Sequence, residues 1–160
     1  ILANFNYVSV DVKLKLLGSQ CAHFYGCQAW NLNDNNIQQF YSMYNQCVRR
    51  LLQLPYRTHT RLIPHLTGRP SVEDQIAKRA RKFISTVTAM SGRVGFLARY
   101  SDHDHLSILR TNRSVAFREM RDWSDEDAAI AHGIIELIQF PPDGISYVEA
   151  RELASFLCTM

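Results

Sequence analysis

The residues best suited to chemistry form a basic and aromatic run between positions 49 and 61. The run contains Arg49, Arg50, Tyr56, Arg57, His59 and Arg61. Arginine binds phosphate through a planar set of N–H donors, and tyrosine or histidine packs on a sugar or a base. No carboxylate pair and no nucleophile beside a base accompanies these side chains. The run therefore predicts a grip on nucleic-acid phosphates and no reaction centre.

A second basic cluster follows about twenty residues later. It consists of Lys78, Arg79, Arg81 and Lys82. Helical spacing puts these cations away from the apolar positions of their own segment. Together with the first run they would follow a phosphate backbone. The simpler alternative is a basic face that only meets solvent.

The other candidate chemical groups have simpler explanations. Asp125 to Asp127 follow Ser124 directly, and acidic residues in the first turn of a helix stabilise its dipole. The Asp-His-Asp-His sequence at 102–105 and the pair His23 and Cys27 both lack a second ligand pair at zinc-binding spacing. We therefore predict no metal site, no cofactor and no independent enzymatic activity for this chain.

Charge is divided unevenly along the chain, whose net charge is +3. Residues 1–121 carry 17 Lys and Arg against 7 Asp and Glu, whereas residues 122–160 carry 1 against 8. Opposite signs suggest two roles, the first suited to a polyanion and the second repelling one. We expect a boundary between Arg99 and Trp123, with a basic thumb-like region at 1–100 and an acidic helical region at 101–160.

Hydrophobic periodicity predicts helices throughout, in an all-α bundle of about six or seven. The first helix is expected from a cap at Ser9 to Tyr25, buried on two sides. The second is expected from a cap at Asn33 to a stop before Pro55, and the third from Ser71 to Gly92. The predicted core face of the third helix is Ile76, Ala80, Phe83, Ile84, Val87 and Met90.

Three further helix starts are predicted in the last sixty residues. Ser101 with Asp104, Ser124 with Asp127 and Ser146 with Glu149 each resemble an N-cap followed three residues later by an acid. A turn is expected at 141–144. The apolar residues of these helices would dock on the basic helices or bind another chain, and we favour docking: Ile130, Ile134, Ile135, Leu137, Ile138, Leu153, Phe156 and Leu157.

Size and composition fit a compact body without covalent staples. A chain of 160 residues, 46% of them hydrophobic, buries about 70% of the surface exposed by its unfolded form. The four cysteines follow no metal-binding spacing, so we expect reduced thiols in an intracellular compartment. No apolar run approaches the ~18 residues of a membrane span.

Three segments resemble the region just after the polymerase palm in reverse transcriptases of non-LTR (LINE-type) retrotransposons. They are FYGCQAW at 24–30, YNQCVRRLLQLPYRTHTRLIPHLTGRPSVEDQI at 44–76 and VGFLAR at 94–99, in the same order as in that family. The resemblance covers roughly residues 9 to 100. The last sixty residues depart from the pattern.

The resemblance implies a helical thumb that holds template and primer while another domain polymerises. Catalytic magnesium would then belong to a palm domain elsewhere in the same polyprotein, of which this chain, starting at Ile1, would be an excerpt. The implied partners are an RNA–DNA hybrid or DNA duplex, the RNA template and that palm domain, without a membrane. The implied location is a nuclear or cytoplasmic ribonucleoprotein. The alternative is a stand-alone helical module whose apolar and acidic surfaces bind a protein.

Overall fold

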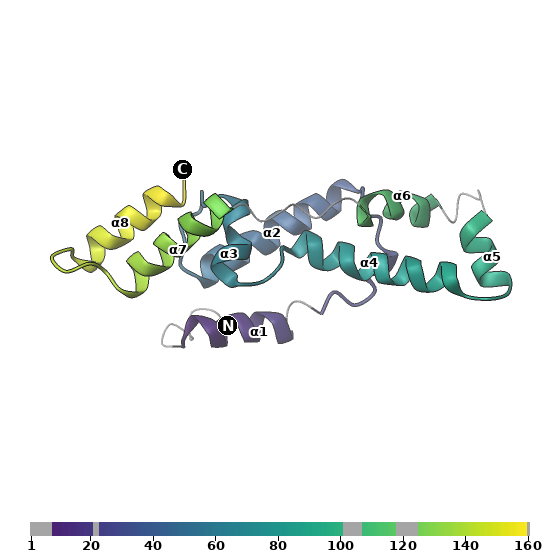
Figure 1. Cartoon of the computed structure of the whole chain (residues 1–160), viewed down its shortest axis with the longest axis horizontal. Helices are drawn as coiled ribbons and strands as arrows, with labels where there is room; N and C mark the ends of the chain where they lie inside the picture. The colour runs from purple at the N-terminus through teal and green to yellow at the C-terminus, as the bar shows by residue number, and fades with distance from the viewer. Residues whose placement is uncertain (1–7, 21–22, 101–106, 118–124, 160) are drawn as a thin grey trace. The chain divides into compact units, whose positions relative to one another are not determined.

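A computed structural model describes residues 8–20, 23–100, 107–117 and 125–159, and these residues are helical without any strand. The all-α prediction is confirmed. The described part has eight α-helices where six or seven were predicted, and the short helices α3 and α5 account for the difference. The elements, drawn in Figure 1, are α1 (Val10–Gln20), η2 (Cys27–Ala29), α2 (Asn35–Leu51), η3 (Thr60–Leu62), α3 (Ile63–Thr67), α4 (Val72–Ala89), α5 (Arg93–Tyr100), α6 (Ser107–Ala116), α7 (Asp125–Gln139) and α8 (Tyr147–Leu157).

The chain divides into two compact units that alternate along the sequence. Unit 1 comprises Ile1–Ala22, Met43–Ser71 and Arg121–Met160, and unit 2 comprises His23–Ser42 and Val72–Met120. The predicted division into 1–100 and 101–160 does not coincide with these units. Sequence charge marks the start of the last segment of unit 1, but it does not reveal that residues 43–71 belong with that segment.

The core of unit 1 joins the segment after α2 to the C-terminal helical hairpin. Leu62, Ile134, Ala154 and Cys158 are buried together. Side chains that are partly buried surround them: Leu54, Leu66, Ile130, Leu137, Ile138 and Leu157. η3 and α3 pack against α7, which lies beside α8 (Figure 1). Five of the eight C-terminal apolar residues predicted to dock lie in this core, but they pack with Leu54, Leu62 and Leu66 of the segment after α2, where the prediction had named the basic helices.

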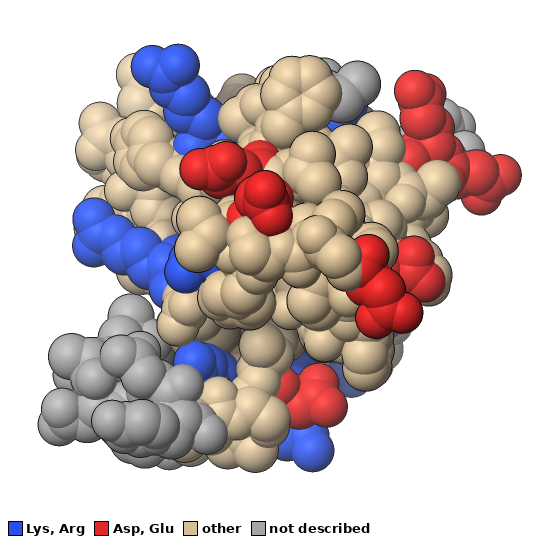
Figure 2. Space-filling view, turned by 90° about the vertical axis from the view of Figure 1, so that its left-hand side faces the viewer, with Lys and Arg blue, Asp and Glu red and all other residues tan. Residues whose placement is uncertain are grey.

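Most acidic residues of the C-terminal segment that the structure describes are exposed, among them Glu126, Glu136, Glu149 and Glu152. Figure 2 views the side on which α7 and α8 lie, and shows red Asp and Glu side chains spread over a largely tan surface, with blue Lys and Arg toward its left and lower edges. Leu153 and Phe156 were predicted to dock, but they are exposed. Their helix instead buries the small side chains of Ala150 and Ala154.

α2 begins and ends at caps that differ from the predicted ones. The Asp34 side chain, not that of Asn33, accepts a hydrogen bond from the Asn36 amide at 2.8 Å. At the other end Gln53 has φ of 56° and its amide donates to the Arg50 carbonyl, while the Leu54 amide donates to the Arg49 carbonyl. These two bonds form a Schellman motif, which ends the helix well before Pro55.

Unit 2 is built around α4, which packs against η2, α5 and α6. Its buried side is Val72, Ile76, Ala80 and Ile84. The buried amide of Asn112 on α6 fixes the segment before α2: it accepts from the Leu32 amide at 2.8 Å and donates to the Trp30 carbonyl at 2.6 Å. Phe83 and Met90, predicted in the core, are exposed.

Two glycines, Gly92 and Gly95, shape the connection between α4 and α5. α4 ends at Ala89. Gly92 has φ of 84°, and its carbonyl accepts a hydrogen bond from the Phe96 amide. Gly92 therefore both separates the two helices and caps the start of α5. At Gly95 a Cβ atom would collide with the carbonyl of Met90. Glycine is therefore required where α5 turns back against the end of α4.

The first predicted helix is shorter and less buried than expected. α1 ends at Gln20, and Phe24 and Gly26 have positive φ of 35° and 75°, which no continuing helix permits. Leu14 is buried, but Val10, Val12 and Leu16 are exposed, so burial on two sides was wrong.

The predicted starts of the last helices fare better where the structure describes them. Ser146 and Glu149 form a full capping box, and the turn at 141–144 closes with a hydrogen bond from the Ile145 amide to the Pro142 carbonyl. α7 begins at Asp125, directly after the predicted cap Ser124. Ser124 itself and the pair Ser101 and Asp104 lie outside the described residues.

Candidate nucleic-acid interface

The loop after α2 contains a tight turn whose tip is formed by Tyr56 and Arg57. The Thr58 amide donates to the Pro55 carbonyl at 3.1 Å, and the Thr58 hydroxyl donates to the same oxygen at 2.7 Å. Thr58 is buried. Two bonds onto one carbonyl and a buried anchor hold the turn in a single conformation, so its two tip residues are presented together.

Arg49 braces this turn from the last turn of α2. Its Nε donates to the Thr58 carbonyl at 2.9 Å, and its Nη2 donates to the Thr60 hydroxyl at 2.9 Å. Burial lowers the pKa of the Arg49 guanidinium, and nearby Tyr56 opposes that shift. An arginine stays charged under such conditions. Two of its donors are already occupied inside the protein, so Arg49 positions the turn.

Three side chains of the predicted basic and aromatic run remain open to solvent. The Tyr56 residue is 73% exposed, and Arg50 and Arg57 are exposed as well. Neither arginine makes an ion pair with any other residue that the structure describes. An exposed aromatic ring next to an exposed arginine in one turn is suited to a nucleotide, because the ring stacks on a base while the guanidinium group binds a phosphate. Arg50, at the end of α2, offers a second exposed cation.

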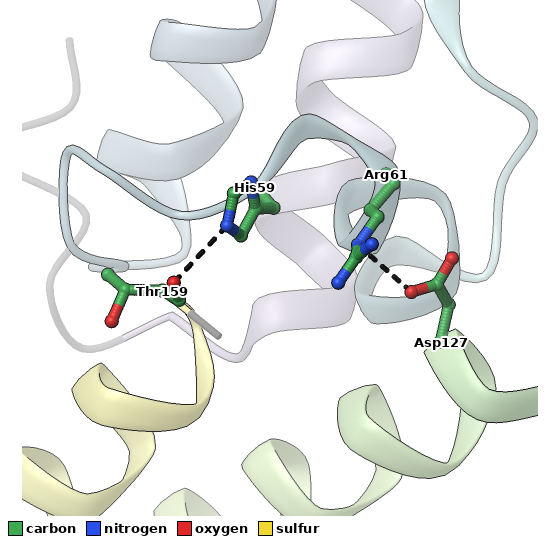
Figure 3. A network of polar contacts seen from close by, with 4 residues as sticks. All are labelled: His59, Arg61, Asp127 and Thr159. Carbon is green, nitrogen blue, oxygen red and sulfur yellow. Dashed lines mark hydrogen bonds and ion pairs between the residues drawn. The ribbon is translucent and has the colours of Figure 1, made fainter.

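His59 and Arg61 turn toward the C-terminal hairpin. The Arg61 Nε lies 3.1 Å from a carboxylate oxygen of Asp127 on α7 (Figure 3). The His59 amide donates to the Cys158 carbonyl at 3.0 Å, and its ring Nε2 lies 3.2 Å from the Thr159 carbonyl oxygen. The predicted loop surface is therefore partly occupied by the acidic segment of its own unit.

The second predicted cluster, on α4, is divided in the same way. Arg79 donates to the His23 carbonyl at 2.6 Å and lies over the Phe24 ring, with 5.6 Å from Cζ to the ring centroid. Arg81 donates to the Ala116 carbonyl at 2.8 Å and lies over the Phe117 ring. Both arginines therefore tie parts of unit 2 together. Lys78 and Lys82 are exposed and remain available to a ligand.

The loop belongs to unit 1 and the α4 cluster to unit 2. Contact of all ten predicted residues with nucleic acid stays a prediction, as does a phosphate path shared by the two clusters.

Metal ligands and thiols are further groups whose chemistry bears on function. They contain no group of three or more His, Cys, Asp or Glu side chains that could hold a metal. Burial raises the pKa of the Cys27 and Cys158 thiols, although Arg79 opposes the shift at Cys27 and a hydrogen bond with Thr58 opposes it at Cys158. Both shifts favour the protonated thiol, which is the less nucleophilic form. Burial also raises the pKa of the Tyr41 hydroxyl to about 12.

A groove of about 320 Å³ lies in unit 1 beside the turn. Apolar and uncharged side chains form most of its wall, and Arg151 is its one charged residue: Gln53, Leu54, Pro55, Ile138, Arg151, Ala154, Ser155 and Cys158. It lacks the converging polar groups typical of an active site. None of the described helices combines the length and apolar character needed to cross a bilayer.

Comparison with known proteins identifies no relative of this chain, which matches no family model, no curated protein and no solved structure. The interpretation of the loop therefore depends on its residues and their contacts, together with the resemblance of the three sequence segments.

Sequence reasoning missed the residues that hold the loop in place. Thr58 is not among the predicted site residues, and Asp127 was explained only as a first-turn acid. The sequence Pro-Tyr-Arg-Thr contains a signal for this turn in its threonine, whose hydroxyl can bond back to a nearby carbonyl of the chain. No comparable signal links Arg61 to Asp127, which are distant in sequence.

Proposed function

We propose that this chain is the non-catalytic thumb and C-terminal part of a LINE-type reverse transcriptase, holding a template–primer duplex through backbone contacts during target-primed reverse transcription. The observation that carries the proposal is the turn braced by Arg49 and Thr58, which holds Tyr56 and Arg57 exposed. A rigid turn binds with little loss of conformational entropy. Contacts to phosphates carry no sequence information, which suits a segment that must slide along any template.

The expected affinity for an RNA–DNA hybrid or a DNA duplex is the non-specific level of ~10⁻⁴ to 10⁻⁶ M, decreasing steeply with salt. Substituting Arg50→Gln and Arg57→Gln together should weaken binding and reduce the slope of log K against log salt by about 2, since each lost phosphate contact removes about 0.9. Fluorescence anisotropy with a labelled hybrid at several salt concentrations measures both quantities.

Two control variants make this measurement specific. Arg93→Gln with Arg113→Gln removes the same charge from exposed positions of unit 2 and should leave the slope almost unchanged.

Arg49→Gln should lower the free energy of unfolding by roughly 1–3 kcal/mol, because the Thr58 carbonyl and the Thr60 hydroxyl lose their donor. A slope that is equal in the Arg50/Arg57 variant and in wild type would contradict the proposal.

A second candidate function, protein binding by the C-terminal hairpin, is favoured by the exposure of large apolar side chains on α8. It does not exclude the first, because it uses a different surface of unit 1.

A further inference from the structure

The face of α8 that points away from the core is apolar and acidic at once. On a helical wheel of ~100° per residue, five residues share a sector of about 140°. We call this the α8 outer face: Val148, Glu149, Glu152, Leu153 and Phe156. The opposite side of the helix carries Ala150 and Ala154, which are buried. The core of unit 1 is thus complete without the three large apolar residues of the outer face.

These three exposed apolar side chains lie together on one face of one helix and are not isolated surface residues. Val148 is 66% exposed, Phe156 64% and Leu153 46%, within one helix of eleven residues. Val148 and Phe156 are two turns apart on one side, about 12 Å along the axis. A run of large apolar side chains that a small protein keeps in water marks an interaction surface.

The two carboxylates on the same face decide which partner fits. Glu149 and Glu152 alternate with the apolar residues, and the surface around the hairpin is rich in acidic side chains (Figure 2). Nucleic acid and anionic lipid headgroups carry the same sign of charge and would be repelled. A second copy of the chain fits less well. Antiparallel pairing of α8 with itself would bring Val148 opposite Phe156, but it would also bring the Glu152 carboxylates of the two copies together, and like charges repel.

We propose that the α8 outer face binds a basic amphipathic helix of a partner protein. Apolar side chains of the partner would cover Val148, Leu153 and Phe156, and its Lys or Arg residues would pair with Glu149 and Glu152. This is the mode in which a helix lays its apolar face on another surface through positions three, four and seven apart. The inference does not depend on the nucleic-acid proposal, because the turn at 55–58 contributes no residue to this face.

The test uses the full chain and a fluorescently labelled amphipathic helical peptide composed of Leu and Lys. Leu153→Ser with Phe156→Ser should weaken peptide binding by about tenfold or more, the usual effect of losing apolar anchors at the centre of an interface. Glu152→Lys should also weaken binding, and most strongly at low salt. Both changes affect exposed positions, so circular dichroism should show an unchanged helix content.

Matched controls separate this site from general stickiness. Met90→Ser with Val94→Ser removes two exposed apolar side chains from unit 2 and should change the affinity by less than about twofold. A peptide in which Glu replaces every Lys should bind much more weakly. Equal binding of the two peptides, or equal weakening by the two double variants, would overturn the proposal.

Sedimentation of the unliganded protein provides a further test. A monomer that binds the Lys peptide supports the assignment. A dimer that dissociates in the Leu153→Ser and Phe156→Ser variant would assign the face to a second copy and overturn the proposal.

Discussion

Arg49 and Arg50 are adjacent in sequence, yet their side chains have opposite surroundings. The guanidinium of Arg49 bonds to Thr58 and Thr60 across the loop, whereas Arg50 is exposed. Because neighbouring helix positions point about 100° apart, one faces the protein and the other faces water. Only the second has all its donors available to a phosphate, so a site defined by residue type alone overstates the number of contacts.

The ion pair between Arg61 and Asp127 gives a direct way to measure how far the acidic segment limits binding. Asp127→Asn should free the Arg61 guanidinium for a phosphate, increase the affinity for duplex at low salt and steepen the salt slope by about 0.9. The same anisotropy titration measures both effects. The cost to stability should not exceed about 1 kcal/mol, since the Arg61 side chain is 50% exposed.

Glu126→Gln is the matched control for this prediction. It removes one negative charge from the same turn of α7, but Glu126 is not the residue that pairs with Arg61. If both variants steepen the slope equally, the effect is one of net charge and the ion pair does not restrict Arg61.

At the scale of helices, caps determine where α2 and α8 begin or end, and the apolar stripe alone does not. The capping box of α8 joins Ser146 and Glu149 through bonds of 2.7 to 3.3 Å. Sequence predicted this box, because its partners lie only three residues apart. The Schellman end of α2 was beyond prediction, because Gln53 adopts the left-handed conformation in place of the usual glycine.

The capping box predicts a defined pH dependence of stability. Hydrogen bonds from the Ser146 hydroxyl and amide lower the pKa of the Glu149 carboxyl in the folded chain. Stability from this group is therefore present above the unfolded pKa of about 4.3 and is lost as pH decreases through the lower folded pKa. Wild type should be more stable than Glu149→Gln at neutral pH, and the difference should shrink between about pH 5 and pH 3.

Urea denaturation followed by circular dichroism across this pH range provides the measurement. Glu152→Gln removes a carboxylate from the same helix without changing the cap and serves as the control. A stability difference between wild type and Glu149→Gln that does not vary with pH would show that the box contributes nothing in its ionised form.

The helices were predicted better than their burial. Periodicity located α2, α4, α7 and α8 and the core of α4 at Ile76, Ala80 and Ile84. It failed for Phe83, Met90, Leu153 and Phe156, because an apolar residue beside the core stripe looks the same in sequence whether or not another helix covers it. Burial depends on partners distant along the chain, and one sequence contains no direct sign of them.

For the whole molecule, the C-terminal residues are part of the structure and not a detachable cover. The basic segment 43–71 and the acidic segment 121–160 share one unit, with Leu62 of η3 buried beside Ile134 and Ala154. The charge split had suggested two separate roles for the basic and acidic parts. The shared core instead ties both segments to one folding unit.

Truncation after Arg121 should therefore unfold unit 1. Loss of α7 and α8 would expose Leu62, Leu54 and Leu66, so we expect reduced helix content and aggregation. Circular dichroism and analytical ultracentrifugation of the truncated chain measure both properties. A helical, monomeric truncation would show that the hairpin is dispensable. Asp127→Asn leaves the core intact and is therefore the better variant for making the Arg61 guanidinium available to a ligand.

The alternation of the two units along the sequence has a consequence during synthesis. Leu62 leaves the ribosome long before Cys158, and at about 5–20 residues per second the interval is roughly 5–20 s. For that time the turn and its arginines lack their apolar support, since the helices that cover Leu62 have not yet been made. The nascent chain therefore carries an exposed, positively charged apolar segment, to which chaperones, or RNA near the ribosome, have access before unit 1 can close.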